Sequence, residues 1–364
     1  MNQKALIQLQ SDLQKTGNEW IAGETPLIFL NEDQQRTILG ANPPEGPPSE
    51  DEKVQSKALA MLQHEEGASR AAAHPSRFDW RNRSGKNFVT PVKNQGGCGS
   101  CVAFGVLAGM ESIVRIKKNN PNYAIDLSEA HLFYCLKGDP NGCSNGWWPS
   151  TAYDKIKASG VALESYFPYT GTQQTCKVKT NWQNQKISIS GHKQIANVNQ
   201  IKEWISKNGP VSACYEVFQD FFAYKSGVYK HTSGNSVGWH CVSVVGYNDV
   251  GGYWIAKNSW GTGWGDNGFF KIKYGECSFE KYGMWGAEGV TNSPWIYSKK
   301  IQGLWTNDSA KNAYAFIQDE GWLKIRNTNE NAYYNLLDCC VAAKAKKKKV
   351  SVKTQNAQIA EIYA

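Results

Sequence analysis

A cysteine stands where an apolar helix is expected to begin, directly behind a glycine-rich turn. Residues 95–104 read QGGCGSCVAF, with Cys101 as the second cysteine. The positive end of a helix dipole favours the thiolate form of such a residue, and the thiolate is the nucleophile. A histidine, His240, and an asparagine, Asn258, follow far downstream. Together they supply a nucleophile, a base and a group that orients the base.

Several ordered blocks surround these residues. They read FDWR at 78–81, PVKNQ at 91–95, LSE at 127–129, YFPY at 166–169 and NSWGTGWG at 258–265. In this order they resemble the papain family of cysteine proteases over about residues 75–290. His240 lies 139 residues beyond Cys101 and Asn258 lies 157 beyond it, against roughly 130–150 in the family. A short insertion at 248–252 accounts for the longer second spacing.

The resemblance implies a role for each residue of the site. Cys101 is the nucleophile and forms an ion pair with His240, whose ring Asn258 orients. Trp260 shields that last hydrogen bond from water, and Gln95 supplies an oxyanion donor together with the Cys101 backbone N–H. The thiolate attacks a peptide carbonyl, His240 protonates the leaving amine, and water releases the acyl enzyme. A free cysteine or a lone histidine is otherwise more often structural.

The same resemblance assigns a substrate-binding wall. Gly146 is expected to let the substrate backbone approach, although Asn145 departs from the usual glycine pair. Val102 also departs, since an aromatic residue normally follows the nucleophile. Two bulky tryptophans after Gly146 either line the cleft or pack in the core. An apolar pocket is expected for the second residue upstream of the cut. The predicted substrate-binding residues are Gly146, Trp147, Trp148, Cys214, Gly238, Trp239, Cys241, Val290 and Trp264.

Ten cysteines require assignment. Alignment with the family implies the bridges Cys98–Cys143 and Cys135–Cys176. Cys214 and Cys241 either bridge or jointly line the apolar pocket. Cys277 is expected to be unpaired because Trp285 replaces its usual partner, and the adjacent Cys339 and Cys340 receive no role. No paired CxxC set supports a metal site, and nothing indicates a cofactor.

We expect an α+β, papain-like two-domain fold whose active site lies in a cleft between a helical half and a β-barrel-like half. The predicted divisions are a prosegment at 1–74, a catalytic domain at 75–293 and a small C-terminal β module at 294–364. In the prosegment, Asn31 is expected to cap a helix that ends at Gly40, before a linker at 42–52 and another helix at 53–73. Further helices are predicted at 103–117 and 129–136, and strands at 241–247, 252–256, 268–273, 313–317, 322–326, 350–353 and 359–363.

Composition and charge bear on which partners and which cellular location are expected for the protein. The net charge is +8, but five of the positive charges lie within 344–349, and no helix-turn-helix, zinc-finger or RNA-binding signature is present, so no nucleic-acid partner is expected. The basic run itself is expected to be a solvated turn rather than a polyanion or membrane-surface site. No apolar run reaches the length of a membrane span. The N-terminus lacks an apolar signal region. The expected disulfides nevertheless favour a secreted, periplasmic or extracellular protein, with cytoplasmic storage or non-standard export as alternatives.

The sequence therefore predicts a cysteine endopeptidase made as a zymogen and cut within about residues 65–75. Its partners would be protein or peptide substrates and its own prosegment. A peptide ligase using the same acyl enzyme is one alternative, and a catalytically silent binding protein is another. The C-terminal module would bind a surface or polymer, or simply cap the catalytic domain.

Overall fold

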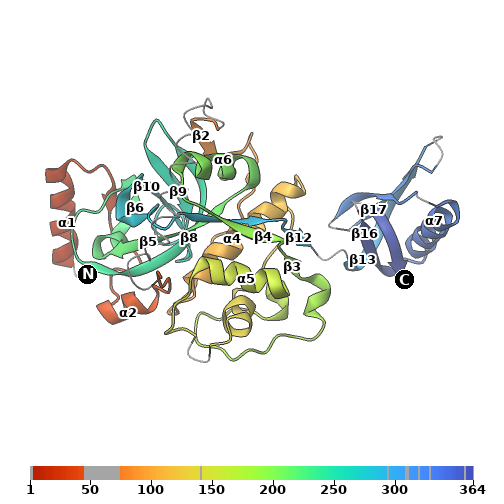
Figure 1. Ribbon diagram of the computed structural model, residues 1–364, viewed down its shortest axis with the longest axis horizontal. Helices are drawn as coiled ribbons and strands as arrows, with labels where there is room; N and C mark the ends of the chain where they lie inside the picture. Colours follow the sequence, from red (N-terminus) through yellow and green to blue (C-terminus); the bar gives the residue numbers. More distant parts are fainter. Residues whose placement is uncertain are drawn as a thin grey trace, which may run out of the picture.

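The computed structural model describes residues 3–44, 74–139, 142–292, 295–307, 311–318, 320–327, 329–355 and 358–363. Most of the predicted linker, the predicted helix at 53–73 and nearly all of the predicted activation region lie outside these residues. The chain forms an N-terminal segment, a body with two hydrophobic cores and a C-terminal barrel with a core of its own. In Figure 1 the N-terminal helices and the barrel lie at opposite ends of the molecule.

The N-terminal segment lies against the sheet-rich half of the body. Helix α1 (Gln3–Thr16) buries Leu6, Leu9 and Leu13, and β1 (Ile21–Ala22) pairs with β6 (Tyr224–Ser226). Helix α2 (Glu32–Thr37) begins at the predicted cap, where the Asn31 side chain accepts a hydrogen bond from the Gln34 N–H at 2.8 Å. The prediction that Gly40 ends this helix is wrong, because Ile38 is the C-cap residue and Gly40 continues into the cleft.

The helical half is built around a long helix, α4 (Cys101–Lys117), which begins at the predicted cysteine. Its sequence is almost entirely apolar over the first four turns, and its side chains are buried on every face there, as expected for a central helix. The predicted second helix appears as a shorter π-helix, η2 (His131–Leu136), and α5 (Pro149–Ser159) packs beside it. The smaller elements of this half are η3 (Glu164–Tyr166), η4 (Trp182–Gln185) and β3 (Ile187–Ser188).

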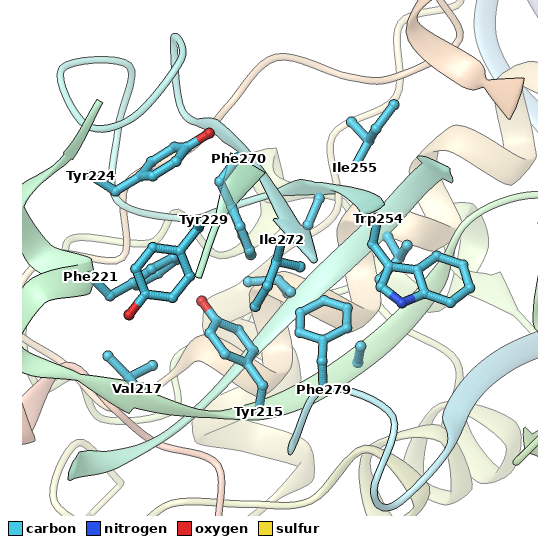
Figure 2. Close-up of a cluster of buried hydrophobic side chains, with 14 of the residues drawn as sticks. Tyr215, Val217, Phe221, Tyr224, Tyr229, Trp254, Ile255, Phe270, Ile272 and Phe279 are labelled. Carbon is cyan, nitrogen blue, oxygen red and sulfur yellow. The ribbon is translucent and has the colours of Figure 1, made fainter. Parts of the chain in front are cut away.

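The other half contains an eight-stranded sheet in which the order β4-β11-β5-β8-β9-β10-β7 forms the main path and β2 pairs with β8. All pairs are antiparallel except β10 with β7. An aromatic core that includes Tyr215, Phe221 and Phe270 fills this half (Figure 2). The strands are β2 (Arg77–Asp79), β4 (Gly191–Ile195), β5 (Val211–Phe218), β7 (Val228–Tyr229), β8 (Ser236–Asn248), β9 (Tyr253–Lys257), β10 (Phe269–Lys273) and β11 (Met284–Glu288).

Short elements connect the strands of this sheet. They are η1 (Trp80–Asn82), α6 (Val198–Asn208), η5 (Gln219–Ala223), η6 (Glu276–Ser278) and β12 (Thr291–Asn292). Helix α4 packs across β8. The contact between α4 and β8 joins the two halves, so residues at the start of α4 and within β8 meet at their boundary. The predicted α+β fold with a helical half and a sheet-rich half is confirmed.

The C-terminal barrel is closed in the order β13-β14-β15-β17-β16. Its strands are β13 (Trp295–Thr306), β14 (Ala313–Ile317), β15 (Gly321–Ile325), β16 (Lys349–Gln355) and β17 (Gln358–Tyr363). The four strands predicted in this region are present. Helix α7 (Glu330–Ala345), which packs against β13 and β17, was not predicted. The prediction that this module contains only β-strands was therefore wrong.

Candidate active site

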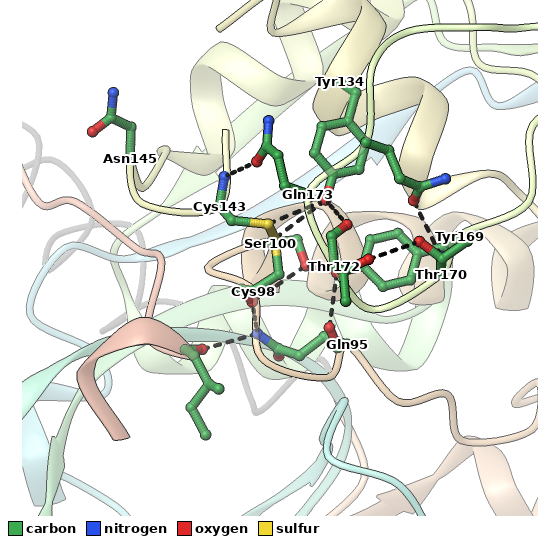
Figure 3. Close-up of a disulfide and its surroundings, with 12 residues drawn as sticks. Gln95, Cys98, Ser100, Tyr134, Cys143, Asn145, Tyr169, Thr170, Thr172 and Gln173 are labelled. Atoms are coloured by element: carbon green, nitrogen blue, oxygen red, sulfur yellow. Dashed lines mark hydrogen bonds between the residues drawn. A yellow bond between two sulfur atoms is a disulfide. The ribbon is translucent and has the colours of Figure 1, made fainter. Parts of the chain in front are cut away.

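The thiol of Cys101 is held at the first turn of α4, at the boundary between the two halves. The residue is fully buried, and the N–H groups of a helix's first turn lack partners within the helix. A disulfide between Cys98 and Cys143 fixes the preceding loop (Figure 3). The Gly99 N–H also donates to the Cys143 carbonyl at 3.0 Å. The second predicted bridge, Cys135–Cys176, is also present. The glycine-rich loop therefore presents the thiol in a fixed position.

The predicted base and its orienting group come from neighbouring strands. His240 lies in β8, and Asn258 follows the end of β9. Their side chains join through His240 Nε2 and Asn258 Oδ1 at 2.8 Å. Because the amide oxygen only accepts, Nε2 carries the proton and Nδ1 keeps its lone pair. The Nδ1 atom is buried and has no hydrogen-bond partner.

Trp260 covers this hydrogen bond from one side. Its ring centroid lies 4.6 Å from that of His240, and its side chain is buried. The rings of Phe222 and Trp264 pack against Trp260 in turn. The predicted shield is therefore positioned to exclude water from the bond between His240 and Asn258.

Gln95 is also buried, and both polar atoms of its side-chain amide form hydrogen bonds. The Ser259 hydroxyl donates to Gln95 Oε1 at 2.6 Å, which orients the amide. Its Nε2 donates to the Cys98 carbonyl and to the Ile38 carbonyl, both at 2.8 Å (Figure 3). A preorganised donor that faces a carbonyl oxygen beside the thiol has the character of an oxyanion donor.

The N-terminal segment occupies the cleft at this point. The N–H of Gly40 donates to Cys101 Sγ at 3.3 Å. A side chain at Gly40 would not fit, because a Cβ there would lie 1.8 Å from the Gly99 carbonyl oxygen. The nucleophile therefore accepts a hydrogen bond from the N–H edge of the Leu39–Gly40 peptide group, whereas attack on that group would require approach to the face of its carbonyl carbon.

The next residues of the segment bond to both walls of the cleft. The Ala41 N–H donates to the Trp239 carbonyl at 3.1 Å, and the Asn42 N–H donates to the Trp147 carbonyl at 2.8 Å. The Trp147 N–H donates to the Gly40 carbonyl at 2.8 Å, which gives a parallel bridge between Ala41 and Trp147. The segment therefore makes backbone contacts that an extended peptide would make.

Burial in the closed cleft shifts the pKa values of both members of the proposed ion pair, although the Gly40 N–H opposes the shift at Cys101. Burial raises the pKa of the Cys101 thiol, and the neighbouring Cys241 thiol adds to this. Burial also lowers the pKa of His240 to about 4, although its hydrogen bond to Asn258 opposes the change. Both shifts favour uncharged groups, so the closed cleft holds a neutral thiol and a neutral imidazole near pH 7.

The pKa shifts predict that docking of the segment depends little on pH between about pH 5 and pH 8. In the closed cleft the Cys101 thiol holds one proton and His240 is neutral, whereas in the open ion pair His240 holds that proton and Cys101 is a thiolate. Because the two forms bind the same number of protons, the equilibrium between them does not change with pH. The dissociation constant of a peptide spanning residues 3–44 should therefore change less than about threefold over this range. Fluorescence anisotropy measures it.

The contrasting variant is Cys101→Ala, which leaves His240 without a thiolate partner. Its open form gains a proton on His240 below the ordinary pKa of about 6.5, whereas the closed form resists protonation down to about pH 4. Its dissociation constant should therefore rise by up to about tenfold per pH unit between those values. An equally steep profile for the wild-type enzyme would contradict the ion pair.

The comparisons with known proteins agree with this geometry. A family profile described as "Papain family cysteine protease" matches residues 74–287, which is more than half of the chain. The chain belongs to the papain family of cysteine proteases. Pro-cathepsin H from Mus musculus is 36% identical over 215 residues, and cysteine proteinase 1 from Entamoeba histolytica is 38% identical over 206 residues. These matches cover 56% and 54% of this chain, and 61% and 63% of those relatives, so less than two thirds of their lengths is matched.

Solved structures of proenzymes share the fold. ProCathepsin B S9 from Trypanosoma congolense superimposes with a TM-score of 0.63 at 24% identity, over 80% of this chain and 99% of that one. Procathepsin L2 proteinase from the larval midgut of Tenebrio molitor gives a TM-score of 0.62 at 25% identity, over 78% and 89%. The papain-like two-domain architecture expected from the sequence is confirmed.

Most of the predicted cleft-wall residues lie around the bound segment. Gly146 permits its passage, because a Cβ there would lie 2.2 Å from Asn42 Oδ1 and 2.8 Å from the Gly40 carbonyl oxygen. The hydrogen bonds to the segment are nevertheless made by the next residue, Trp147. At Gly238, an added Cβ would lie 3.3 Å from the side chain of Leu39.

The proposed apolar pocket is lined by buried thiols and rings. Cys214 and Cys241 lie directly opposite each other on β5 and β8, but both are free, so the bridge suggested for them is absent. Ala41 belongs to the buried cluster that contains both thiols and Val290. Trp148 packs edge-on against Trp285 and Tyr282, and Tyr282 in turn contacts Trp239. Sequence reasoning missed Tyr282, which lies three residues before Trp285.

Trp264 does not line the cleft, and its assignment to the substrate wall was wrong. The ring is fully buried and packs on Trp260, Phe221 and Phe270. Its position behind Trp260 makes it a support for the shield. Cys277 is free as predicted, and the neighbouring Trp285 is buried.

A buried network of charges behind the site was also missed. Lys93 Nζ lies 3.0 Å from Glu111 and 2.8 Å from Glu129, and Lys257 Nζ donates to Thr90, which bonds to Glu111. Burial raises the pKa of Glu129 to about 8 and lowers the pKa of Lys257 to about 8. Because Lys257 immediately precedes Asn258, the network ties the orienting residue to α4. Lys93 and Glu129 belong to the sequence blocks PVKNQ and LSE, so these two charged residues could have been identified from the sequence.

Replacing Glu111 with glutamine should destabilise the protein by about 3–5 kcal/mol, because it removes the carboxylate that acts most strongly on the buried Lys257 ammonium and one of the three carboxylates around Lys93. Chemical denaturation measures the change. The matched control is Asp126→Asn, since Asp126 contacts the same Lys93 at 2.6 Å but is 59% exposed. That change should cost less than about 1 kcal/mol. Equal losses would contradict the interpretation that burial makes Glu111 essential.

Among the described residues, no group of three or more His, Cys, Asp or Glu side chains is arranged to hold a metal ion. The other histidines of the described residues have partners outside the site. His131, for example, accepts a hydrogen bond from the Ala162 N–H at 3.2 Å.

Proposed function

We propose that the protein is a cysteine endopeptidase made as a zymogen, in which residues 3–44 block the cleft. The observation that carries this proposal is the Gly40 N–H on Cys101 Sγ, with the Ile38 carbonyl on the oxyanion donor Gln95. The segment uses the substrate contacts but presents the N–H edge of a peptide group to the thiol, rather than the face of a carbonyl carbon that attack requires. It is therefore an inhibitor that the site cannot attack in this arrangement.

Removal of the segment would let water reach Cys101 and His240, which favours the thiolate–imidazolium pair. The thiolate then attacks the carbonyl carbon of a substrate peptide, and Gln95 with the Cys101 N–H stabilises the oxyanion. His240 gives its proton to the departing amine. It next takes a proton from water, which attacks the thioester and releases the acid product and the free thiol.

The position of Ala41 supports a preference for an apolar substrate residue. Its backbone lies between Trp147 and Trp239, and its side chain belongs to the cluster that includes Cys214 and Cys241. We assign this region to the second residue upstream of the cut. Peptides with leucine there should be cleaved faster than peptides with aspartate, and equal rates would contradict the assignment.

A thiol trap tests the zymogen proposal directly. Wild-type protein and Cys101→Ala are treated with an epoxide or vinyl sulfone, with and without limited proteolysis, and their intact masses are measured. Labelling of the wild type only after loss of about 75 N-terminal residues is the expected result. Rapid labelling of the full-length chain would discard the blocking role of the segment. No label dependent on Cys101 in either form would discard the peptidase itself.

The two disulfides support a protein that works in an oxidising compartment outside the cytoplasm. Within the described residues, no helix has both the length and the apolar character needed to span a bilayer. Mass spectrometry of the natural protein with and without reduction tests the assignment. Free thiols at all four positions would contradict it.

A further inference from the structure

The barrel at the C-terminal end has a specific topology. Strand β13 pairs with both β14 and β16 and so closes the barrel, while β15 and β17 pair in parallel. Helix α7 connects β15 to β16. A closed five-stranded barrel with this order has the arrangement of an OB fold, which often binds oligomeric ligands on the outer face of its central strands. A fold alone does not determine function, which depends on the residues exposed at the site.

Four aromatic side chains gather on the outer face of β13, β14 and β15. Ala313, Ala315 and Ile317 are fully buried, so the alternating residues of β14 face outward. The strand register places Trp305 opposite Tyr314 and Trp322 opposite Phe316. We call Trp305, Tyr314, Phe316 and Trp322 the aromatic platform.

The rings of the platform form two edge-on pairs. Trp305 and Tyr314 have centroids 5.5 Å apart, and Phe316 and Trp322 have centroids 5.3 Å apart. A Cβ at Gly303 would lie 2.9 Å from Trp322, so this glycine makes room for the indole. Trp305 is 47% exposed and Trp322 is 51% exposed. Large rings exposed this far on one face are characteristic of an interaction surface.

Positive charge accompanies the platform. Lys324 lies opposite Tyr314 in the register, and its ammonium group is 5.9 Å from the tyrosine ring. Lys300 and Lys349 are paired on β13 and β16. Residues 294–364 contain eleven Lys and Arg against six Asp and Glu. The carboxylate of Glu320, which lies just before β15, forms an ion pair with Lys118 at 2.9 Å and accepts a hydrogen bond from the Tyr123 hydroxyl at 3.0 Å. Both partners lie in the helical half, between α4 and η2.

We propose that the aromatic platform and Lys324 bind single-stranded nucleic acid. Exposed rings stack on unpaired bases, and lysines beside them neutralise phosphates, which is how OB folds hold single strands. Neutral sugars also stack on such rings, but they give no use for the excess of lysine. A double strand hides the faces of its bases. The sequence argument against nucleic acid considered charge and linear motifs, whereas the platform is assembled from three strands.

Anisotropy of a fluorescent 20-nucleotide oligo(dT) tests the proposal on the full-length Cys101→Ala protein, which cannot digest itself. Trp322→Ala and Trp305→Ala should each weaken binding by at least about tenfold, the effect of losing one stacked base. Lys324→Gln should weaken binding and reduce its salt dependence. The control is Tyr334→Ala, which removes a 51%-exposed ring on α7 rather than on the sheet and should change binding less than twofold.

Crosslinking keeps the test decisive if a tryptophan variant folds poorly. This test uses the protein whose aromatic platform is intact. Oligonucleotides carrying 5-bromouracil should crosslink to peptides that contain β13, β14 or β15. Crosslinks confined to 344–349 would overturn the proposal. It would also be overturned by an absence of oligonucleotide binding, or by equal binding of double-stranded DNA that Trp322→Ala leaves unchanged. None of these outcomes bears on the peptidase activity, which is read from the thiol trap.

Discussion

Replacing Gly40 with alanine is expected to open the zymogen. The added Cβ would lie 1.8 Å from a backbone oxygen of Gly99, which belongs to the loop fixed by a disulfide. Neither chain can yield without loss of the hydrogen bonds that dock the segment at Cys101 and Gln95. A docking penalty of about 3 kcal/mol corresponds to about a 100-fold change in the docking equilibrium. The full-length variant should therefore react with a vinyl sulfone about 100-fold faster than the wild type.

The control is the same substitution elsewhere in the segment. Gly17 has a positive φ of 67°, as a glycine turn often does, but no atom lies within 4 Å of a Cβ built there. Gly17→Ala therefore introduces backbone strain without a clash in the cleft and should react at nearly the wild-type rate. If Gly40→Ala stays as unreactive as wild type, the segment does not depend on its close approach to Gly99.

The catalytic residues could be predicted because local patterns specify each of them. The glycine-rich turn and the apolar run placed Cys101 at the start of α4, and the structure begins the helix there. His240 and Asn258 stand in blocks whose order resembled the papain family, and strands β8 and β9 bring them within 2.8 Å. Their meeting depends on register, which a single sequence does not reveal without that resemblance.

A blocking prosegment was predicted from the family resemblance, but the residue that it places at Cys101 could not be predicted from local rules. Gly40 follows a short helix and was interpreted as its C-terminal cap, which is a common role for glycine. In the structure its small size matters for contact with Gly99, a residue far along the chain. Trp264 was misassigned for a related reason. An aromatic residue in the same block as Asn258 can face the cleft or the core, and only the packed rings of Trp260 and Phe270 place it in the core.

Helix α7 was missed although a signal was present. Asn329 caps the helix by accepting a hydrogen bond from the Ala332 N–H, and the buried positions 333, 336, 340 and 343 follow a helical period. Strand-like stretches on both sides favoured an all-β interpretation instead. The aromatic platform had no such signal, because its four rings come together only through the pairing of three strands.

Replacing Gln95 with alanine is expected to lower kcat/KM of the mature enzyme by about 100–1,000-fold, the usual effect of losing one oxyanion donor. The amide is fully buried, and its Nε2 donates to the Ile38 carbonyl oxygen at 2.8 Å, a bond that the proposed mechanism transfers to the substrate oxyanion. Because the bond strengthens as that charge develops, the loss should fall mainly on kcat. Steady-state kinetics with a peptide substrate separates kcat from KM.

Ser259→Ala provides the matched control, because it removes the hydroxyl that orients Gln95 at 2.6 Å but keeps the donor. Loss of one neutral hydrogen bond is worth about 1 kcal/mol, so kcat should fall by only about five- to tenfold. If Gln95→Ala stays within about threefold of wild type, the amide serves only to hold the Cys98 loop and the N-terminal segment. If the two variants are equally impaired, the hydroxyl contributes more than orientation, since removing it would cost as much as removing the donor itself.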